Sequence, residues 1–519
     1  MRRFAPLLAA GVLATLVPAL APAQASAAET TTAPSSDILR QKPDWQRCDP
    51  ELSAAYECAT VKVPLDYRKP KGATLDVAIS RIKAADPAKR HGVLLSNPGG
   101  PGGSGLDMPL LLDEHLPKEV REQYDLIGFD PRGVGRSSPI SCGLTDAEQN
   151  WLRPYKPETF TADVAWARSV ADKCRQQAKD VLPHITTRNT ARDMDVIRAV
   201  LGERKVSYLG YSYGTYLGAV FTEMFPQRSD RIVLDSGVDP QRAWRGMIQV
   251  WAEGAEPAFH RWTQWTAQRS AEYGLGDTPD AVSRTFWDLV ARADKDPIPF
   301  EGQKLTGDDI RSARPYFFYP QQAAELVKAL KAAAEGRPPA GSVPEGFLRG
   351  RAGGPAADNS TAVFLAVVCG DTDAWPRDPE QYRQDAVRDK ARYPLFGDFA
   401  SNIMPCAFWD RPAEKATAVN NRTPVLTVQN EWDSQTPLTS GEGLHRALKG
   451  SRMVLAAGGE GHGVYLFDPA SCANAPVSAY LATGRLPYQD ITCTTPPAEG
   501  GRLTQPKPAP PFPGAPDRF

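Results

Sequence analysis

The sequence predicts an α/β fold in which a mostly parallel central sheet carries an inserted helical cap. Three observations support this prediction. Short apolar runs of strand length recur between helical segments in both halves of the chain. One of these runs, residues 206–209, leads through a Gly-Tyr-Ser-Tyr-Gly turn directly into an amphipathic helix. From about residue 240 to residue 362 the strand pattern stops, and the sequence becomes helical, Trp-rich and Pro-rich.

Residues 1–27 have the features of a secretory signal, with two arginines ahead of an apolar segment and a small-residue cleavage site. The apolar segment is short and interrupted by Pro18, so it is not expected to anchor the chain in a membrane. Residues 28–44 are rich in Thr, Ser and Pro, which predicts a disordered leader or pro-segment. We therefore expect a secreted, extracellular protein whose folded part begins at about residue 45.

The overall composition excludes several classes of function. With 519 residues and 41% hydrophobic side chains, the chain can bury a core of ordinary size and has room for more than one domain. A net charge of −1 argues against nucleic-acid binding, which needs a basic face. No other apolar run approaches the length of a membrane span. A monomer is expected. Residues 501–519 are Pro-rich and predict a loose tail.

Eight cysteines in a secreted chain indicate disulfides. Their spacings do not resemble metal sites, so no metal is expected. The sequence alone leaves many pairings open. Because the cysteines cluster in neighbouring pairs, we expect nearest-neighbour bonds: Cys48 with Cys58, Cys142 with Cys174, Cys369 with Cys406, and Cys472 with Cys493.

The first part of the sheet domain is expected to span residues 45–239. Residues 61–66 and 75–82 alternate between apolar and polar side chains and predict an antiparallel hairpin. Two buried parallel strands are expected next, at residues 93–96 and 124–129.

The elements around the turn at residues 210–214 follow the same logic. A capping box that begins at Thr190 predicts the start of a helix that ends at Gly202. This helix leads into the strand before the turn, and residues 231–235 predict the strand that follows.

The cap is expected to span residues 240–362. Its many aromatic side chains can form the cap's own core or line a substrate channel, and the first arrangement is the commoner. The apolar run at residues 363–368 is expected to return the chain to the sheet as a strand, opening the second part of the sheet domain, residues 363–500. Strands at residues 424–429 and 453–455 complete the sheet.

The turn at residues 210–214 carries the chemistry. In a strand, Gly-x-Ser-x-Gly, helix context, the turn is so tight that side chains two residues from the serine would collide. Glycine at both places lets the Ser212 hydroxyl stand above the sheet edge, at a helix N-terminus whose N–H groups favour developing negative charge. This context predicts that Ser212 is a nucleophile of the kind found in α/β-hydrolases.

A nucleophilic serine needs a base, which in α/β-hydrolases follows both the serine and the acid along the chain. Only three of the six histidines follow Ser212. His260 and His445 lie in helical segments, where packing or surface roles are expected. His462 lies on a glycine-rich loop just past the last predicted strand, where a mobile base belongs. We therefore predict that His462 is the base.

The acid is expected on the loop after the preceding strand, and Glu431 and Asp433 both qualify. Aspartate is the commoner choice, so we predict Asp433. The alternative interpretation of Asp433 is a turn residue, since Asp followed by Ser readily forms turns.

The oxyanion hole is expected on the glycine-rich segment at residues 97–105, which follows a predicted strand. Glycines there let the backbone approach a substrate carbonyl and direct an N–H group at it. We predict the N–H groups of Gly100 and Tyr213 as donors. A phosphate loop is the rival interpretation, but no Gly-Lys-Ser/Thr follows, and no cofactor is expected.

Taken together, these motifs resemble the proline-iminopeptidase branch of the α/β-hydrolases, and within it the secreted bacterial tripeptidyl aminopeptidases. The resemblance covers most of the chain and rests on residues 97–105, the Asp-Pro-Arg-Gly-Val-Gly-Arg-Ser segment at residues 130–137, the serine turn, Asp433 and His462. The branch usually carries a His-Gly-Gly-Pro-Gly motif at the oxyanion loop. Here Asn and Pro precede the glycines, which argues against a plain proline iminopeptidase.

The resemblance implies a secreted serine exopeptidase that releases short peptides, expected to be tripeptides, from substrates with free N-termini. An esterase or lipase is a second interpretation, because the same triad serves esters. A catalytically inactive hydrolase fold that acts as a binding protein is a third, and the intact set of Ser212, Asp433 and His462 argues against it.

An aminopeptidase must also recognise the substrate ammonium group, and a cation is costly to desolvate without a carboxylate partner. Glu253 and Glu256 lie early in the cap, where related exopeptidases carry such acids. Asp371 follows the apolar run at residues 363–368. These three residues are the predicted anchors, and for each of them an ordinary helix or turn carboxylate is an equally good interpretation.

Overall fold

The computed structural model describes residues 34–338 and 358–495, so the predicted signal at residues 1–27 and the tail at residues 501–519 lie outside the described residues. The strands of the main sheet are β1 (Gln46–Arg47), β2 (Glu57–Pro64), β3 (Thr74–Ile82), β4 (Gly92–Asn97), β5 (Tyr124–Phe129), β6 (Val206–Tyr211), β7 (Ser229–Asp235), β10 (Val425–Trp432), β11 (Ser451–Glu460) and β12 (Ile491–Thr494).

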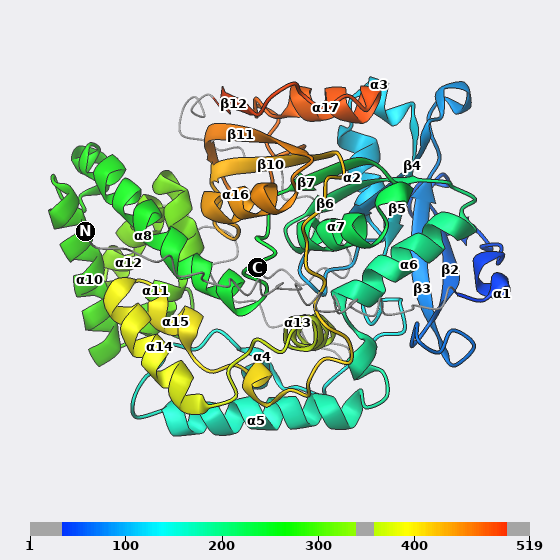
Figure 1. Cartoon of the computed structure of the whole chain (residues 1–519). Helices are drawn as coiled ribbons and strands as arrows, with labels where there is room; N and C mark the ends of the chain where they lie inside the picture. The colour runs from blue at the N-terminus through cyan, green and yellow to red at the C-terminus, as the bar shows by residue number, and fades with distance from the viewer. Residues whose placement is uncertain (1–33, 339–357, 496–519) are drawn as a thin grey trace, which may run out of the picture.

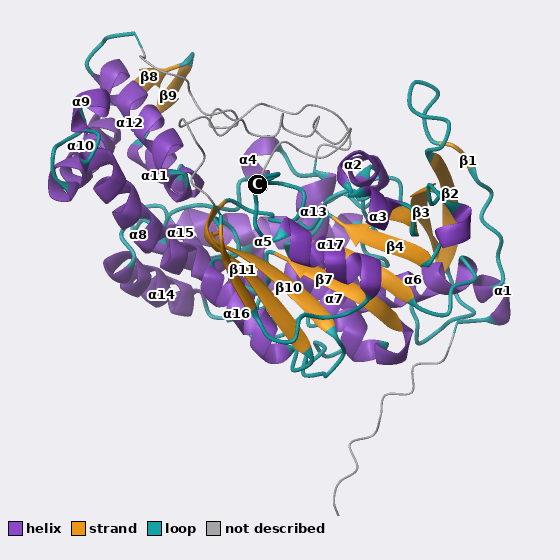
Figure 2. Ribbon diagram, turned by 90° about the horizontal axis from the view of Figure 1, so that it is seen from above, coloured by secondary structure: helices purple, strands orange, loops and turns teal. Residues whose placement is uncertain are grey.

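The ten strands have the order β1-β2-β3-β5-β4-β6-β7-β10-β11-β12. The three pairings that join β1, β2, β3 and β5 are antiparallel, and every pairing from β5 to β12 is parallel. The central strands β4 and β6 are buried along their whole length, as expected of parallel strands covered on both faces. The structure confirms the predicted α/β fold with a mostly parallel sheet (Figures 1 and 2).

Helices cover both faces of the sheet. One face carries α2 (Met108–His115), α3 (Lys118–Arg121) and α17 (Asn474–Thr483), which share a core with it. The other face carries α6 (Thr187–Val200), α7 (Tyr213–Met224) and α16 (Leu438–Ala447), with α5 (Phe160–Gln177) and α13 (Asn359–Gly370) packed beyond them (Figure 1). Short elements complete this part: α1 (Ser36–Leu39), α4 (Asp146–Gln149) and the 3-10 turns η1 (Pro87–Lys89), η2 (Leu182–His184), η3 (Pro226–Arg228) and η5 (Pro405–Phe408).

The predicted cap region forms a helical layer at one end of the molecule (Figure 1). It consists of α8 (Arg245–Ala267), α9 (Ser270–Tyr273), α10 (Pro279–Lys295), the hairpin β8 (Ile298–Phe300) and β9 (Gln303–Leu305), α11 (Gly307–Ser312), η4 (Arg314–Phe318) and α12 (Pro320–Ala334). These elements enclose their own core, in which Phe259, Trp262, Phe286 and Phe317 pack ring against ring. These aromatic residues therefore belong to the cap core.

The structure corrects the predicted path out of the cap. The apolar run at residues 363–368 is not a returning strand but the middle of helix α13, whose residues 362–369 are all buried. A helix that is apolar on all sides reads as a continuous apolar run, and periodicity does not separate it from a buried strand. Two further helices, α14 (Pro379–Arg392) and α15 (Gly397–Ser401), pack together, and α15 contacts α8. The helical layer therefore extends beyond residue 362.

Two boundaries also differ from the prediction. Helix α6 begins at Thr187, with Thr186 as the N-cap that accepts a hydrogen bond from the Asn189 N–H, so the capping box placed at Thr190 was wrong by one turn. Residues 34–44 include helix α1, and Gln41 exchanges two hydrogen bonds with the backbone of Lys62. The described fold thus begins ahead of residue 45.

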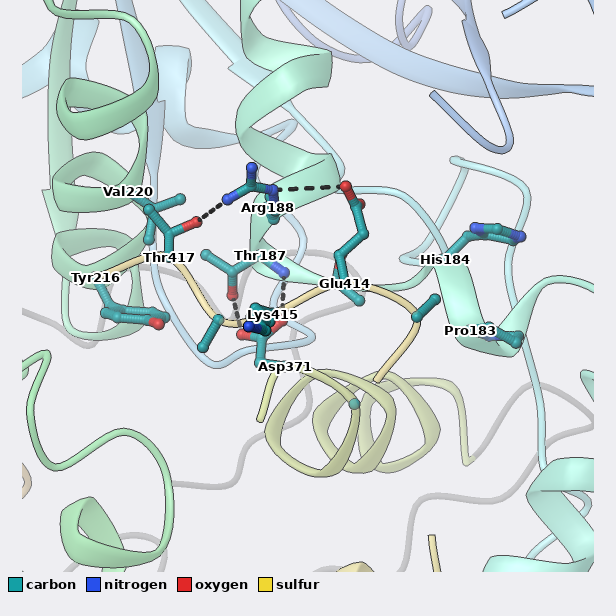
Figure 3. A pocket seen from close by; sticks show the side chains of 14 residues that line it. Pro183, His184, Thr187, Arg188, Tyr216, Val220, Asp371, Glu414, Lys415 and Thr417 are labelled. Carbon is teal, nitrogen blue, oxygen red and sulfur yellow. Dashed lines mark hydrogen bonds and ion pairs between the residues drawn. The ribbon is translucent and has the colours of Figure 1, made fainter. Parts of the chain in front are cut away.

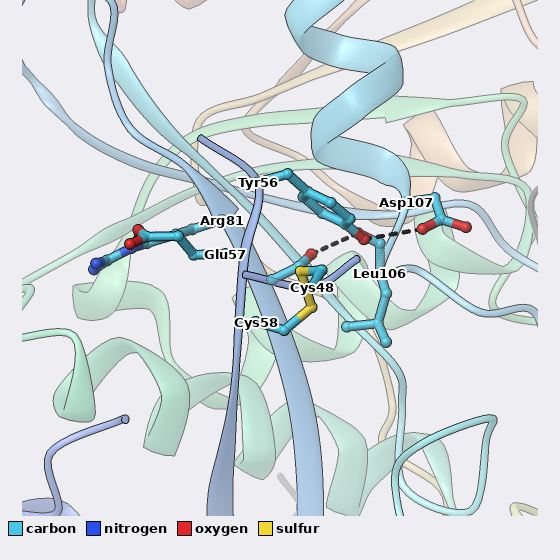
Figure 4. Close-up of a disulfide and its surroundings, with 8 residues drawn as sticks. Cys48, Tyr56, Glu57, Cys58, Arg81, Leu106 and Asp107 are labelled. Carbon is cyan, nitrogen blue, oxygen red and sulfur yellow. Dashed lines mark hydrogen bonds and ion pairs between the residues drawn. A yellow bond between two sulfur atoms is a disulfide. The ribbon is translucent and has the colours of Figure 1, made fainter. Parts of the chain in front are cut away.

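All four predicted disulfides are present: Cys48–Cys58, Cys142–Cys174, Cys369–Cys406 and Cys472–Cys493. The first ties the residue that follows β1 to strand β2, beside a Tyr56 hydroxyl that donates to the Leu106 carbonyl (Figure 4). Within residues 34–338 and 358–495, no helix combines the length and the apolar character needed to cross a membrane.

Candidate active site

The serine turn has the strained geometry that the sequence predicts. Ser212 joins β6 to α7 with φ 56° and ψ −124°, a conformation that non-glycine residues rarely adopt. A side chain at Gly210 would place its Cβ 2.5 Å from the Gly214 carbonyl oxygen, so only glycine fits there. The turn is held by the Thr215 N–H, 2.8 Å from the Ser212 carbonyl, and by the Ser212 N–H, 3.0 Å from the Asp235 carbonyl.

The glycine-rich loop after β4 lies against this serine. A Cβ at Gly99 would stand 2.8 Å from Ser212 Cβ and 3.4 Å from its Oγ. The Gly99 N–H donates to Asn97 Oδ1 at 3.0 Å. The N–H groups of Gly100 and Tyr213 donate to no protein acceptor in the described part of the chain. Both are therefore available for a substrate oxyanion, as the prediction requires.

The segment at residues 130–137 positions the glycine-rich loop from behind. Asp130 Oδ1 accepts hydrogen bonds from Ser104 Oγ at 2.5 Å and from the Gly105 N–H at 3.1 Å. Its Oδ2 accepts from the Arg136 N–H at 2.8 Å. One buried carboxylate therefore ties the end of the oxyanion loop to the turn after β5.

The structure brings the candidate acid and base into contact. Asp433 is fully buried, and its two carboxylate oxygens lie 2.9 and 3.0 Å from His462 Nδ1. Oδ1 of Asp433 also accepts from the N–H groups of Gln435 and Thr436, and Oδ2 from the Thr436 hydroxyl. Glu431, the alternative acid, instead accepts from the Gly458 N–H. Asp433 is the acid that contacts the imidazole.

Burial and the mutual attraction of Asp433 and His462 shift the pKa of each group in opposite directions. Burial alone would raise the pKa of Asp433, but the neighbouring His462 and the hydrogen bonds from Thr436 and Gln435 hold it below its usual value. Burial alone would lower the pKa of His462, but the charge and hydrogen bond of Asp433 raise it. The pair is therefore arranged to stabilise a positive charge on the imidazole.

Ser212 lies next to the loop that carries the imidazole. The Asp235 carbonyl accepts from the Ser212 N–H, while the Asp235 carboxylate accepts from the Val464 and Tyr465 N–H groups. The Tyr211 hydroxyl, one residue before the serine, donates to the Tyr465 carbonyl at 3.0 Å. No hydrogen bond joins Ser212 Oγ to His462 among the described residues. In a ligand-free enzyme such bonds are often long and tighten only around substrate.

The cap reaches both catalytic loops, and the sequence analysis missed the residues that do so. Trp251 Nε1 donates to the Gln435 carbonyl at 2.6 Å, and Arg314 Nη1 donates to the Ser434 carbonyl at 2.6 Å. Tyr319 packs against the base loop, where a Cβ at Gly461 would lie 2.5 Å from the Tyr319 hydroxyl oxygen. Each contact joins segments more than a hundred residues apart, so no local sequence signal points to it.

None of the three predicted ammonium anchors points at the acid loop. On α8, Gly254 packs against Pro437, and a Cβ there would lie 2.5 Å from Pro437 Cγ. Helical geometry turns Glu253 about 100° and Glu256 about 200° away from that contact. Glu253 pairs with Arg242, and Glu256 Oε1 accepts from the Leu395 N–H at 2.9 Å.

Asp371 lies in a different place, at the N-terminus of α6, where it lines a small polar pocket (Figure 3). Its Oδ1 accepts from the Thr187 N–H at 2.8 Å, and its Oδ2 accepts from the Thr187 hydroxyl and from Trp244 Nε1. Burial raises the pKa of Asp371 to about 6, although these hydrogen bonds favour its charged form. Because both oxygens are occupied by protein donors, Asp371 has the contacts of a helix cap.

Two family models match the chain: alpha/beta hydrolase fold over residues 92–319, and TAP-like protein over residues 393–493. A tripeptidyl aminopeptidase from Streptomyces lividans is 37% identical over 479 residues, which cover 87% of this chain and 86% of that protein. A serine protease from Mycobacterium tuberculosis is 29% identical over a match that covers 88% of this chain and 91% of that protein. A carboxylesterase B from Mycobacterium tuberculosis is 31% identical over a match that covers 94% of this chain and 97% of that protein. The chain belongs to the tripeptidyl aminopeptidase-like serine peptidases of the α/β-hydrolase superfamily.

Proposed function

We propose that the protein is a secreted serine exopeptidase that releases short peptides, in particular tripeptides, from free N-termini, with Ser212, His462 and Asp433 as its catalytic triad. The observation that carries this proposal is the contact of the buried Asp433 carboxylate with His462 Nδ1, on the loops beside the strained Ser212 turn. The relatives named as a tripeptidyl aminopeptidase and a serine protease support the reaction class.

In this mechanism Ser212 Oγ attacks the scissile carbonyl carbon while His462 Nε2 takes the hydroxyl proton. The N–H groups of Gly100 and Tyr213 bind the oxyanion that forms. His462 then gives its proton to the departing amine, leaving the peptide as an ester on Ser212. Water, deprotonated by the same imidazole, hydrolyses the ester and restores the serine. Asp433 holds the imidazole in the tautomer that leaves Nε2 free to accept.

Secretion is part of the proposal. The signal features of residues 1–27 support it, as do the four disulfides, because such bonds form and persist in oxidising compartments.

The decisive experiment compares three substrates: a tripeptide carrying a chromogenic amide, the same peptide with an acetylated N-terminus, and a simple aryl ester. An exopeptidase that pairs the substrate ammonium with a carboxylate should lose about 10²–10³-fold in kcat/KM on acetylation, the cost of one lost buried charge partner. Equal cleavage of the free and acetylated peptides would remove the exopeptidase proposal.

The anchor for the ammonium group is tested in the same assay. Glu256 faces away from the acid loop, but of the three predicted acids it alone has a carboxylate oxygen without a protein donor among the described residues, so it is the one to test first. In Glu256→Gln the free and acetylated peptides should be cleaved at similar rates. Glu253→Gln is the matched control on the same helix, since Glu253 is already paired with Arg242. Discrimination that survives in both variants would exclude both glutamates.

An esterase is the second candidate, and the relative named as carboxylesterase B favours it specifically. The same triad would form the same ester intermediate from an ester substrate. Fast turnover of the aryl ester together with no turnover of the peptide amide would decide for this alternative.

A further inference from the structure

The three backbone N–H groups that follow His462 all donate to one dipeptide at the end of β7. The Gly463 N–H lies 2.9 Å from Ser236 Oγ, the Val464 N–H 3.0 Å from Asp235 Oδ1, and the Tyr465 N–H 2.7 Å from Asp235 Oδ2. Ser236 Oγ in turn donates to Asp235 Oδ1 at 3.0 Å. One carboxylate and one hydroxyl thus accept from the whole segment that leaves the candidate base.

The same dipeptide also contacts the serine turn and the acid strand. The Asp235 carbonyl accepts from the Ser212 N–H at 3.0 Å, and the Ser236 N–H donates to the Val428 carbonyl of β10 at 2.9 Å. Ser236 holds a φ of 64°, a left-handed conformation that costs free energy for a serine. Such strain persists only where the surrounding contacts determine it, and here they come from all three catalytic segments.

We infer that Asp235, together with Ser236, is a positioning residue for the base: it fixes the His462 loop relative to Ser212 and places a second negative charge near the imidazole. This inference rests on the proposed triad. No hydrogen bond joins Asp235 to the imidazole among the described residues, since His462 Nδ1 is bonded to Asp433, so Asp235 acts through the backbone of residues 463–465 and through its charge.

The charge is what separates this role from that of an ordinary buried hydrogen-bond acceptor. Asp235 is fully buried, and burial raises its pKa to about 7 against the hydrogen bonds from Tyr465, Ser236 and Val464. The charged groups that act on His462 are Asp433 and Asp235, which raise its pKa, and Arg314 of the cap, which lowers it. The other ionisable groups packed there are the hydroxyls of Tyr211, Tyr319 and Tyr465, and the pair of Glu460 with Arg261.

The sign of the effect follows. The imidazole must be neutral to accept the serine proton, so activity rises as the pH passes the pKa of His462. Asp235→Asn removes a negative charge that favours the protonated imidazole, and the pKa of His462 should fall. The acidic limb of kcat/KM should therefore move to lower pH, by less than roughly one unit, because Asp235, with a pKa of about 7, is itself partly protonated along that limb. Asparagine also has only one side-chain oxygen, so one of the N–H groups that Asp235 binds loses its acceptor. The base loop is then held less firmly, and kcat should fall by roughly 10-fold or more.

The matched control is Asp358→Asn. Asp358 is also buried and accepts from two N–H groups, those of Cys142 and Leu144, and from the Ser141 hydroxyl. None of these partners belongs to a catalytic segment. Asp358→Asn should reduce stability without moving the acidic limb. A limb that stays in place in Asp235→Asn, or moves equally in the control, overturns the inference.

Two further measurements keep the test decisive. Ser236→Ala removes one hydroxyl and keeps the Asp235 carboxylate, so it should lower kcat several-fold and move the limb less than Asp235→Asn does. Full activity in this variant would contradict the positioning role. The pKa of His462 can also be read directly by NMR titration in a Ser212→Ala background, with and without Asp235→Asn. A Ser212→Ala protein that still turned over substrate would refute the proposed triad, which is a separate outcome.

Discussion

The acid loop and the base loop leave neighbouring parallel strands, β10 and β11, yet the molecule holds them in different ways. The acid loop is fastened by the cap as well as by its own strand, in which Gln429 Nε2 donates to the Thr436 carbonyl at 2.8 Å. Trp251 and Arg314 donate to its carbonyls, and Gly254 of α8 packs on Pro437 at its end. The base loop is fastened mainly by the sheet, through Asp235 and Ser236 of the β7 end and through Asn430 of β10, whose amide donates to the Glu460, Gly461 and Gly463 carbonyls.

This difference assigns separate roles to the two parts of the protein. The sheet fixes the imidazole relative to the serine, whereas the cap determines whether the carboxylate that orients the imidazole is itself held in place. Among the described residues the cap meets the base loop through Tyr319, whose hydroxyl lies beside Gly461, and through Arg261, which pairs with Glu460. Closure of the cap over substrate would therefore act on Asp433 more directly than on His462.

The largest expected effect tests the triad on which the comparison depends. Ser212→Ala and His462→Ala should each lower kcat by roughly 10⁶-fold, and the double variant should be little worse, because the residues act as a unit. Steady-state kinetics on the free tripeptide amide measures this. A serine-directed phosphonylating reagent should label Ser212 alone, and labelling at another serine would contradict the assignment.

Asp433→Asn comes next, with a loss of about 10⁴-fold in kcat. Asparagine retains the shape of the side chain but presents an N–H group to the imidazole and favours the wrong tautomer. The Thr436 and Gln435 N–H groups, which bond Asp433 Oδ1, still have an acceptor available, so the thermal midpoint should change much less than the rate. A variant that kept wild-type activity would show that Glu431 or another acid orients His462.

A smaller effect is expected when a cap residue that binds the acid loop is replaced, and its direction distinguishes the contribution of the cap from that of the sheet. Arg314→Met removes the bond to the Ser434 carbonyl and a positive charge that lowers the pKa of His462. The expected results are a loss of roughly 10-fold in kcat/KM and a shift of the acidic limb to higher pH, opposite to the shift in Asp235→Asn.

Arg242→Met is the matched control for Arg314→Met, because Arg242 is an arginine at the start of the cap that pairs with Glu253 instead of with a carbonyl of the acid loop. A limb that moves in the same direction in Arg314→Met and Asp235→Asn would show that both act through general loss of structure.

The smallest effect on activity is expected at the far edge of the sheet. Cys472 and Cys493 join the start of α17 to β12, the strand that pairs with β11. Replacing both with alanine should lower the free energy of unfolding by about 2–4 kcal/mol, measured by denaturant titration. Because β7 and β10 hold the base loop, kcat at a temperature where the variant is folded should be unchanged. A large loss of kcat would place β12 among the supports of the base.

The features that could be predicted from the sequence are those that depend on residues adjacent in the chain. The serine turn needs glycine at positions 210 and 214, and the oxyanion loop is a run of glycines after a strand. His462 differs from the other histidines by its place after the last predicted strand. Asp433 was chosen over Glu431 on frequency alone, and the structure supplies the contact that distinguishes them.

The wrong predictions share a physical cause, which is burial or pairing set by distant segments. Residues 363–368 carry no polar face, so their period could not separate a helix from a strand. The sequence likewise does not show that Arg242, Thr187 and Trp244 supply partners for Glu253 and Asp371 from elsewhere in the chain. Asp235 and Arg314 carry no local signal, because their importance comes from the loops they meet.

The close approach of Gly254 to Pro437 sets a rule for recombining these enzymes. Any side chain at residue 254 would meet the proline ring within 2.5 Å, so helix α8 and the acid loop are matched surfaces. A chimera that exchanges caps between a peptidase and an esterase relative would therefore need to transfer residues 433–437 along with the cap. The serine turn and the base loop could remain with the recipient, since their supports lie in the sheet.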